Sequence, residues 1–232
     1  MCWRPKLRDE EVFADILGSF SVHPTLQQNI ARIDGSFSSP LSDLQRFVIV
    51  LGLCQRDLLC IAPAGFGQWA AALVSMLAVT NRHRKIYSEP RQGLCPDALI
   101  LCATDAACNE VAELGEKLAK GTDLQCLRCD AGSQGPGGLV LVATPQELLE
   151  FKEQVDLKDC FGLVLHGAST MLDMGLMGDL RRITKHHGMP KADHRHTMVF
   201  GSHSPRLKEL ASELLFVPLT ATTAPSPWRC AE

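Results

Sequence analysis

The sequence predicts an α/β domain of three layers, in which a mostly parallel sheet lies between two layers of helices. Short runs that are apolar throughout alternate along the chain with helical patterns. Strands of this composition are buried on both faces, as they are in parallel sheets covered by helices. With 232 residues, of which 46% are hydrophobic, the chain is long enough to bury such a core in a single domain.

In the first part of the chain, helical patterns at residues 24–34 and 41–53 precede a first apolar strand at 57–62. A glycine-bearing turn separates that strand from a helical pattern over 68–81. The polar residues 82–93 have the composition of a connecting loop.

The middle of the chain continues the alternation. ALILCA, residues 98–103, predicts a buried strand, and residues 105–119 predict a helix. That helix carries its apolar side chains on one face, at Ala107, Val111, Leu114 and Leu118. LQCLRC, residues 124–129, predicts a short strand, and the glycine-rich residues 130–138 predict a loop.

The last third repeats the pattern. Apolar strands are expected at 139–143, 161–166 and 197–201, and helices at 145–154, 176–186 and 205–215. The helix at 145 begins with a proline, which is favoured at the first helical position. Residues 220–232 have lost periodicity and predict a mobile tail.

Composition excludes several classes of protein. A net charge of −3 gives no general attraction to nucleic acid or to an anionic membrane. The sequence contains no uncharged apolar run of 18 residues, so it predicts no membrane span. Its first residues also lack the apolar core of a signal peptide. Most of the ten cysteines lie in apolar runs, which favours buried reduced thiols and a cytosolic or nuclear location.

One cysteine pair, Cys126 and Cys129, has the spacing of metal ligands. The histidine-rich residues 185–196 are the segment that could complete such a site. A single CxxC is weak evidence for zinc, and a solvated loop is the preferred interpretation of the histidines. We therefore expect no metal site.

Ligands of parallel sheets bind beyond the carboxyl ends of the strands. Unusual residues follow five of the predicted strands, at 63–67, 103–104, 144–145, 166–169 and 201–204. The first has the strand–loop–helix frame of a phosphate-binding loop, G-x-x-x-x-G-K-[ST]. Gln68 stands in place of its lysine, however, and Trp69 in place of its Ser/Thr.

Further segments surround the other strands. SSPLSDLQ ends at residue 45 and QRDLL begins at 55; ATDAAC begins at 103, TPQE at 144, VLHGASTMLDMGL at 164 and GSH at 201. In order and spacing they resemble the motifs of the first RecA-like domain of DEAD-box RNA helicases. ATDAAC stands at the family's PTRELA, TPQE at its TPGR and GSH at its SAT. His166, Gly167, Ala168 and Ser169 stand at its DEAD tetrad.

This resemblance implies a single RecA-like domain with a three-layer α/β/α architecture over residues 20–217. An N-terminal extension over 1–19 and a flexible C-terminal tail over 218–232 flank it. Asp57 of QRDLL matches the family's lead-in to the phosphate loop.

The resemblance also implies which residues would bind a nucleotide: Phe20, Gln45, Gly65, Gly67 and Gln68. Hydrolysis needs a cationic lysine, a hydroxyl on Mg²⁺ and carboxylates for the metal and the attacking water. Gln68, Trp69, His166 and Gly167 supply none of these. We expect no catalytic residue and no cofactor, with weak nucleotide binding through the glycine loop as the open alternative.

The RNA-facing motifs are altered in the same way. Thr104, Thr144 and Pro145 survive as residual RNA contacts, but the family's arginine positions hold Asp105 and Glu147, which repel phosphates. Basic residues at 82–85 and 181–185 are interpreted as solvated surface and as a helix end.

Three hypotheses remain. The preferred one is a non-catalytic pseudo-helicase domain that binds protein partners in a ribonucleoprotein assembly, in the cytoplasm, its granules or the nucleus; degenerate DEAD-box domains of this kind occur in some Tudor-domain proteins of the piRNA pathway. The alternative is a weak RNA- or nucleotide-binding module without unwinding activity. The third is a hydrolase built from His166, Ser169 and His203, but no G-x-S-x-G elbow supports it. No membrane or DNA partner is expected.

Overall fold

A computed structural model describes residues 16–32, 41–63, 65, 67–86, 93–129, 138–186 and 188–222. Its centre is a seven-stranded sheet in which every strand pair is parallel and the order is β3-β4-β2-β5-β6-β1-β7. The strands are β1 (Leu58–Ile61), β2 (Ala98–Cys102), β3 (Gln125–Arg128), β4 (Leu139–Ala143), β5 (Gly162–His166), β6 (His196–Gly201) and β7 (Leu219–Thr222).

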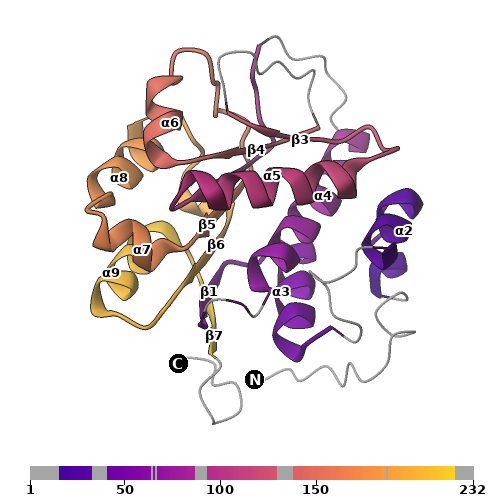
Figure 1. Cartoon of the computed structure of the whole chain (residues 1–232), viewed down its shortest axis with the longest axis horizontal. Helices are drawn as coiled ribbons and strands as arrows, with labels where there is room; N and C mark the ends of the chain where they lie inside the picture. Colours follow the sequence, from indigo (N-terminus) through magenta and orange to yellow (C-terminus); the bar gives the residue numbers. More distant parts are fainter. Residues whose placement is uncertain are drawn as a thin grey trace.

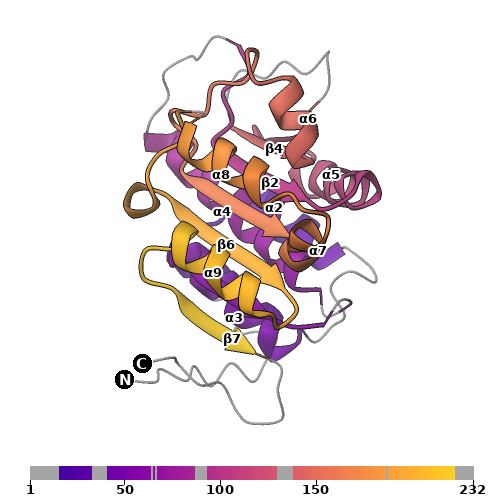
Figure 2. The ribbon, with the colours of Figure 1, turned by 90° about the vertical axis from the view of Figure 1, so that its left-hand side faces the viewer.

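Helices cover both faces of the sheet (Figure 1). One face carries α2 (Pro24–Arg32), α3 (Asp43–Leu53), α4 (Gln68–Ile86) and α5 (Asp105–Ala119). The other carries α6 (Pro145–Glu150), α7 (Ala168–Asp173), α8 (Met177–His186) and α9 (Pro205–Leu214), with the short η1 (Ala192–His194) before β6. Figure 2 shows α8 and α9 in front of the strands and α3 and α4 behind them. The three-layer α/β/α prediction is confirmed.

Side chains from the two faces of each central strand pack into two separate apolar cores. In β2, Ile100 packs into the core under α4 and α5, whereas its neighbours Leu99 and Leu101 pack into the core under α7 and α9. This is why the central strands are apolar at every position and not at alternate ones.

Buried aspartates fix the amino-terminal ends of the central strands. The Asp57 carboxylate accepts hydrogen bonds from the Thr197 amide at 2.8 Å and the Phe216 amide at 2.7 Å. Asp97 does the same for the amides of Gly138 and Leu139, at 2.8 and 3.1 Å. Each carboxylate therefore ties the beginning of one strand to the chain that enters a neighbouring strand.

All six predicted strands form, but a seventh was missed. Residues 219–222, assigned to a mobile tail, form β7, which pairs in parallel with β1. The sequence LTAT has no apolar run because β7 is an edge strand that is paired on one side only. The domain accordingly extends past residue 217, while the rest of the tail, 223–232, lies outside the described residues.

The N-terminal boundary also differs. Residues 1–15 lie outside the described residues, but residues 16–19 are helical and Leu17 is buried in the core that α2 and α3 cover. The end of the predicted extension is thus part of the domain.

Two predicted segments change length. The segment 82–86, predicted as a loop, continues α4 to Ile86. Basic side chains are favourable in the last turn of a helix, because they interact with the negative end of the helix dipole. The helix predicted over 145–154 ends at Glu150, after which Phe151 caps it.

The cysteine pair cannot share a metal ion. Cys126 belongs to the core on the α4 and α5 face, and Cys129 belongs to the core on the other face. His194 is exposed in η1 and His196 is buried in β6. Among the described residues no group of three or more His, Cys, Asp or Glu could hold a metal. Within the same part of the chain, no helix has both the length and the apolar character to cross a membrane.

Asp57→Ala should destabilise the domain strongly, because it leaves the buried amide of Thr197 and the part-buried amide of Phe216 without acceptors. We expect the free energy of unfolding in urea to fall by about 2–4 kcal/mol. Asp173→Ala, an exposed aspartate at the end of α7, is the control and should change stability little. Equal stability of the two variants would contradict the role assigned to Asp57.

Candidate functional site

The carboxyl ends of β1, β2, β4, β5 and β6 lie on one edge of the sheet. The strand register places Cys102 beside His166, His166 beside Phe200, and Ile61 beside Gly201. The segments that follow these strands are therefore brought together, as the sequence predicts. We call this the motif edge.

The glycine loop keeps its backbone form. Gly65 and Gly67 have φ values of 91° and 67°, which only glycine adopts readily. The loop leads directly into α4 at Gln68. Ala64 and Phe66 lie outside the described residues. The turn between β1 and α4 thus explains the two glycines without a ligand.

Gln68, which stands at the lysine position, folds back on this loop. Its side chain is 7% exposed, and its Nε2 donates a hydrogen bond to the carbonyl of Pro63 at 3.1 Å. The amide therefore closes the loop on itself, and it carries no charge for a terminal phosphate.

Trp69 and His166 contact each other across the motif edge. Their ring centroids are 5.5 Å apart, with an angle of 31° between the ring planes. Burial lowers the pKa of His166 to about 4, so the imidazole is neutral at pH 7. By the resemblance, these two positions would supply a hydroxyl and a carboxylate to Mg²⁺. Here they form an aromatic pair with no hard oxygen ligand.

The remaining residues of the tetrad form the beginning of α7. Gly167 is its N-cap with a φ of 80°, and a Cβ there would lie 3.3 Å from that of Ala103. Ala168 is buried. A carboxylate side chain at 167 would thus be strained as well as crowded.

Ser169 joins the tetrad to the end of β6. Its Oγ donates a hydrogen bond to the carbonyl of Ser202 at 2.9 Å. A Cβ at Gly201 would lie 2.5 Å from the same Oγ, so the serine that the family has at 201 would require the Ser169 side chain to move. No hydrogen bond joins Ser169 to His166 or His203 in the described structure, and the geometry of a serine hydrolase is absent from these residues.

The surviving RNA-motif residues begin helices. The Thr104 hydroxyl accepts from the Ala107 amide at 3.3 Å as the N-cap of α5. Thr144 and Glu147 form a capping box at the start of α6, where Pro145 occupies the first turn. Helix capping accounts for all three predicted RNA contacts, Thr104, Thr144 and Pro145.

Phe20 and Gln45 likewise have structural partners. The Gln45 Oε1 accepts from the Ser42 amide at 2.9 Å, which completes a capping box at the start of α3. Phe20 is half-buried and packs against the core on the α3 and α4 face.

Arg128 is the residue that the sequence interpretation missed. At the end of β3, its guanidinium donates to Oδ1 of Asp105 at 2.8 Å, to Oδ1 of Asn109 at 2.5 Å and to Oε1 of Glu147. Burial would raise the pKa of Glu147, but hydrogen bonds from Thr144 and Arg128 outweigh it and hold that pKa below its ordinary value. The sequence places two acids at the family's arginine positions, but it does not show that β3 brings Arg128 to them.

The basic residues of α8 are also used within the fold. Arg181 and Lys185 form ion pairs with Glu213 of α9, and Arg181 also contacts Glu209 at 3.3 Å. The hydrogen bond from Arg181 lowers the pKa of Glu213 to about 2. These two cations join α8 to α9.

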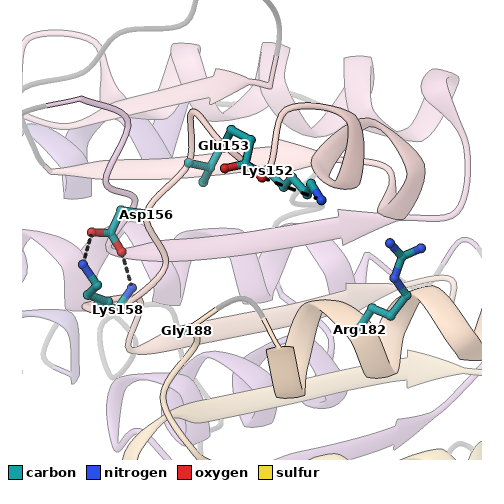
Figure 3. A pocket seen from close by; sticks show the side chains of 7 residues that line it. Lys152, Glu153, Asp156, Lys158, Arg182 and Gly188 are labelled. Atoms are coloured by element: carbon teal, nitrogen blue, oxygen red, sulfur yellow. Dashed lines mark hydrogen bonds and ion pairs between the residues drawn. The ribbon is translucent and has the colours of Figure 1, made fainter.

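A polar hollow of about 550 Å³ lies elsewhere (Figure 3). Its lining comes from the segment after α6 and from the region of α8, namely Lys152, Glu153, Val155, Asp156, Lys158, Arg182 and Gly188. Lys158 pairs with Asp156 at 3.0 Å, and Lys152 with Glu153 at 3.7 Å. These segments lead into the amino-terminal ends of β5 and β6, so the hollow is not part of the motif edge.

The fold and the motif edge define a single RecA-like α/β domain. In S. cerevisiae, Dbp5, solved in a complex with Gle1 and IP6, has the same fold: the TM-score is 0.72 at 19% identity over 90% of this chain and 52% of that one. No family model matches the chain.

Sequence relatives are DEAD-box and other ATP-dependent RNA helicases. The chain is 30% identical over 202 residues to the probable ATP-dependent RNA helicase DDX4 of Rattus norvegicus, and 28% identical over 216 residues to a vasa-like helicase of Penaeus vannamei. It is 31% identical over 206 residues to the DEAD-box ATP-dependent RNA helicase 52A of Oryza sativa subsp. japonica. These matches cover 81–87% of this chain but only 28–34% of the relatives, so the chain corresponds to one DEAD-box helicase-like domain of a longer protein type.

Stability should fall on mild acidification. Burial lowers the pKa of both His166 and His196 from the ordinary 6.5 to about 4. Between these values the unfolded chain takes up protons that the folded chain does not, so the free energy of unfolding decreases as the pH drops. From about pH 7 to about pH 5 we expect a loss of about 2 kcal/mol for each histidine.

Urea unfolding of His166→Phe over the same pH range tests this, since phenylalanine keeps a ring against Trp69 and does not titrate. The variant should lose about half of the pH dependence, whereas His203→Gln, at an exposed position of the motif edge, should keep it. An unchanged slope in His166→Phe would show that His166 is not buried as described.

Proposed function

We propose that this domain is a non-catalytic pseudo-helicase domain that acts as a protein-interaction scaffold in a ribonucleoprotein assembly. The observation that carries the proposal is the contact between Trp69 and His166. The side chains at two positions that would hold Mg²⁺ in an active helicase instead contact each other through their rings. The neighbouring Gln68 donates a hydrogen bond to the carbonyl of Pro63 in its own loop. A site arranged in this way has no group to neutralise a γ-phosphate or to activate water.

The ribonucleoprotein setting rests on the relatives, which are RNA helicases by name. The protein-interaction role has a precedent in the structural neighbour, which was solved bound to the protein Gle1. In this chain, Phe216 and Val217 are exposed side by side before β7, at 67% and 56%, and large apolar side chains of this kind suit a protein contact. We place the assembly in the cytoplasm and in RNA metabolism or silencing.

A second candidate function is a weak nucleotide- or RNA-binding module. Gly65 and Gly67 keep the loop whose backbone amides precede the 19-residue helix α4, and a helix N-terminus favours an anion. Without a lysine, this attraction alone would support weak binding that does not depend on Mg²⁺.

Titration with a fluorescent ATP analogue, with and without Mg²⁺, and then with single-stranded RNA tests the proposal. The scaffold function predicts no saturable binding of either ligand in the low micromolar range. Weak binding that Mg²⁺ does not change would favour the second candidate. Mg²⁺-dependent micromolar binding would overturn both, because it requires the metal site that Trp69 and His166 fill.

Restoring the phosphate loop alone should not restore hydrolysis. In Gln68→Lys/Trp69→Thr the lysine and hydroxyl return, but His166 and Gly167 still supply no carboxylate for the metal and the water. We expect phosphate release to stay at the level of the unchanged domain in a steady-state assay with ATP and Mg²⁺. Turnover in this double variant, above that of Gln68→Lys alone, would show that the account of the metal site is wrong.

A further inference from the structure

We propose that Arg128 is an anion-binding side chain that two carboxylates of its own chain, Asp105 and Glu147, hold closed. The two acids accept the guanidinium N–H groups that a phosphodiester strand would otherwise bind. The motif edge therefore excludes RNA because its cation is already paired within the chain. This inference deepens the proposed function and rests on it for the absence of RNA binding in the unchanged domain.

The guanidinium is engaged on both of its terminal nitrogens. One donates to Asn109, and the other donates to Asp105 and Glu147. A guanidinium binds carboxylate and phosphate oxygens with the same planar geometry, so each of these acids occupies a place suited to a phosphate. The Arg128 side chain is 27% exposed, which leaves it accessible to a strand from solvent once the acids no longer hold it.

The two carboxylates begin two helices, and one of them has a partner besides Arg128. Asp105 is the first residue of α5, where a negative charge is favourable beside the helix N-terminus. Glu147 is held by the capping box with Thr144 at the start of α6. The capping box therefore preorganises Glu147, and the guanidinium of Arg128 joins β3 to the beginnings of α5 and α6.

The charge of this cluster decides what it attracts. Two carboxylates against one guanidinium leave it net negative, which repels a polyanion. If both acids become amides, the hydrogen-bonding oxygens remain but the cluster becomes net positive. The same side chains would then offer a cation at the edge where TPQE and ATDAAC meet.

The test is the variant Asp105→Asn/Glu147→Gln, titrated with a fluorescently labelled single-stranded RNA at low salt and followed by anisotropy. A glutamine at position 147 preserves the capping box, as Gln45 does with Ser42 in this chain, so α6 keeps its start. We expect binding about tenfold tighter than that of the unchanged domain, with a steeper dependence on salt. Asp105→Asn alone, at an exposed position, should give part of the gain.

Two controls separate this mechanism from a general change in charge. Glu110→Gln/Glu113→Gln removes two exposed acids from α5 that do not contact Arg128, and it should give no comparable gain. Adding Arg128→Gln to the first variant should abolish the gain. No gain in the first variant, an equal gain in the α5 control, or a gain that survives loss of Arg128 would each overturn the proposal. The nucleotide titration of the unchanged domain is a separate measurement, so failure here would leave the scaffold proposal standing.

Discussion

The fold depends on how the parallel strands are held at their amino-terminal ends. Parallel strands have no tight turns between them, so something other than a hairpin must fix their relative positions. Asp57 and Asp97 do this with buried carboxylates that accept backbone amides from the chain entering the neighbouring strands. Asp57 also accepts, through its own carbonyl, the amide of Leu219 at 2.9 Å, which begins the edge strand β7. These carboxylates lie at the edge opposite the motifs.

The two edges of the sheet are therefore held by different means. Residues at the carboxyl ends are held by local features: the glycine turn before α4, the caps Thr104 and Thr144, and the close contact of Gly201 with Ser169. None of these features requires a ligand. A cradle for phosphate persists because the same backbone is needed to pass from a strand to a helix.

Much of the architecture could be predicted from the sequence, because central strands that are buried on both faces consist of unbroken apolar runs. The edge strand β7 could not, since half of LTAT is threonine and its pairing with β1 depends on a distant aspartate. Positions along the motif edge were also predictable, but contacts were not. Arg128 reaches Asp105 and Glu147 only because β3 lies beside β4, a strand order that composition does not encode.

Several residues at the altered motif positions contact one another. Trp69 meets His166, Ser169 meets the segment after Gly201, and Arg128 meets both acids at the former arginine positions. Trp69 and His166 both stand at motif positions that differ from the DEAD-box pattern, whereas Ser169 contacts a backbone carbonyl. Reverting Trp69 or His166 would remove the ring contact between them. Trp69, His166 and Ser169 are thus packed into the domain at the motif edge, and changing one of them would alter the contacts of its neighbours.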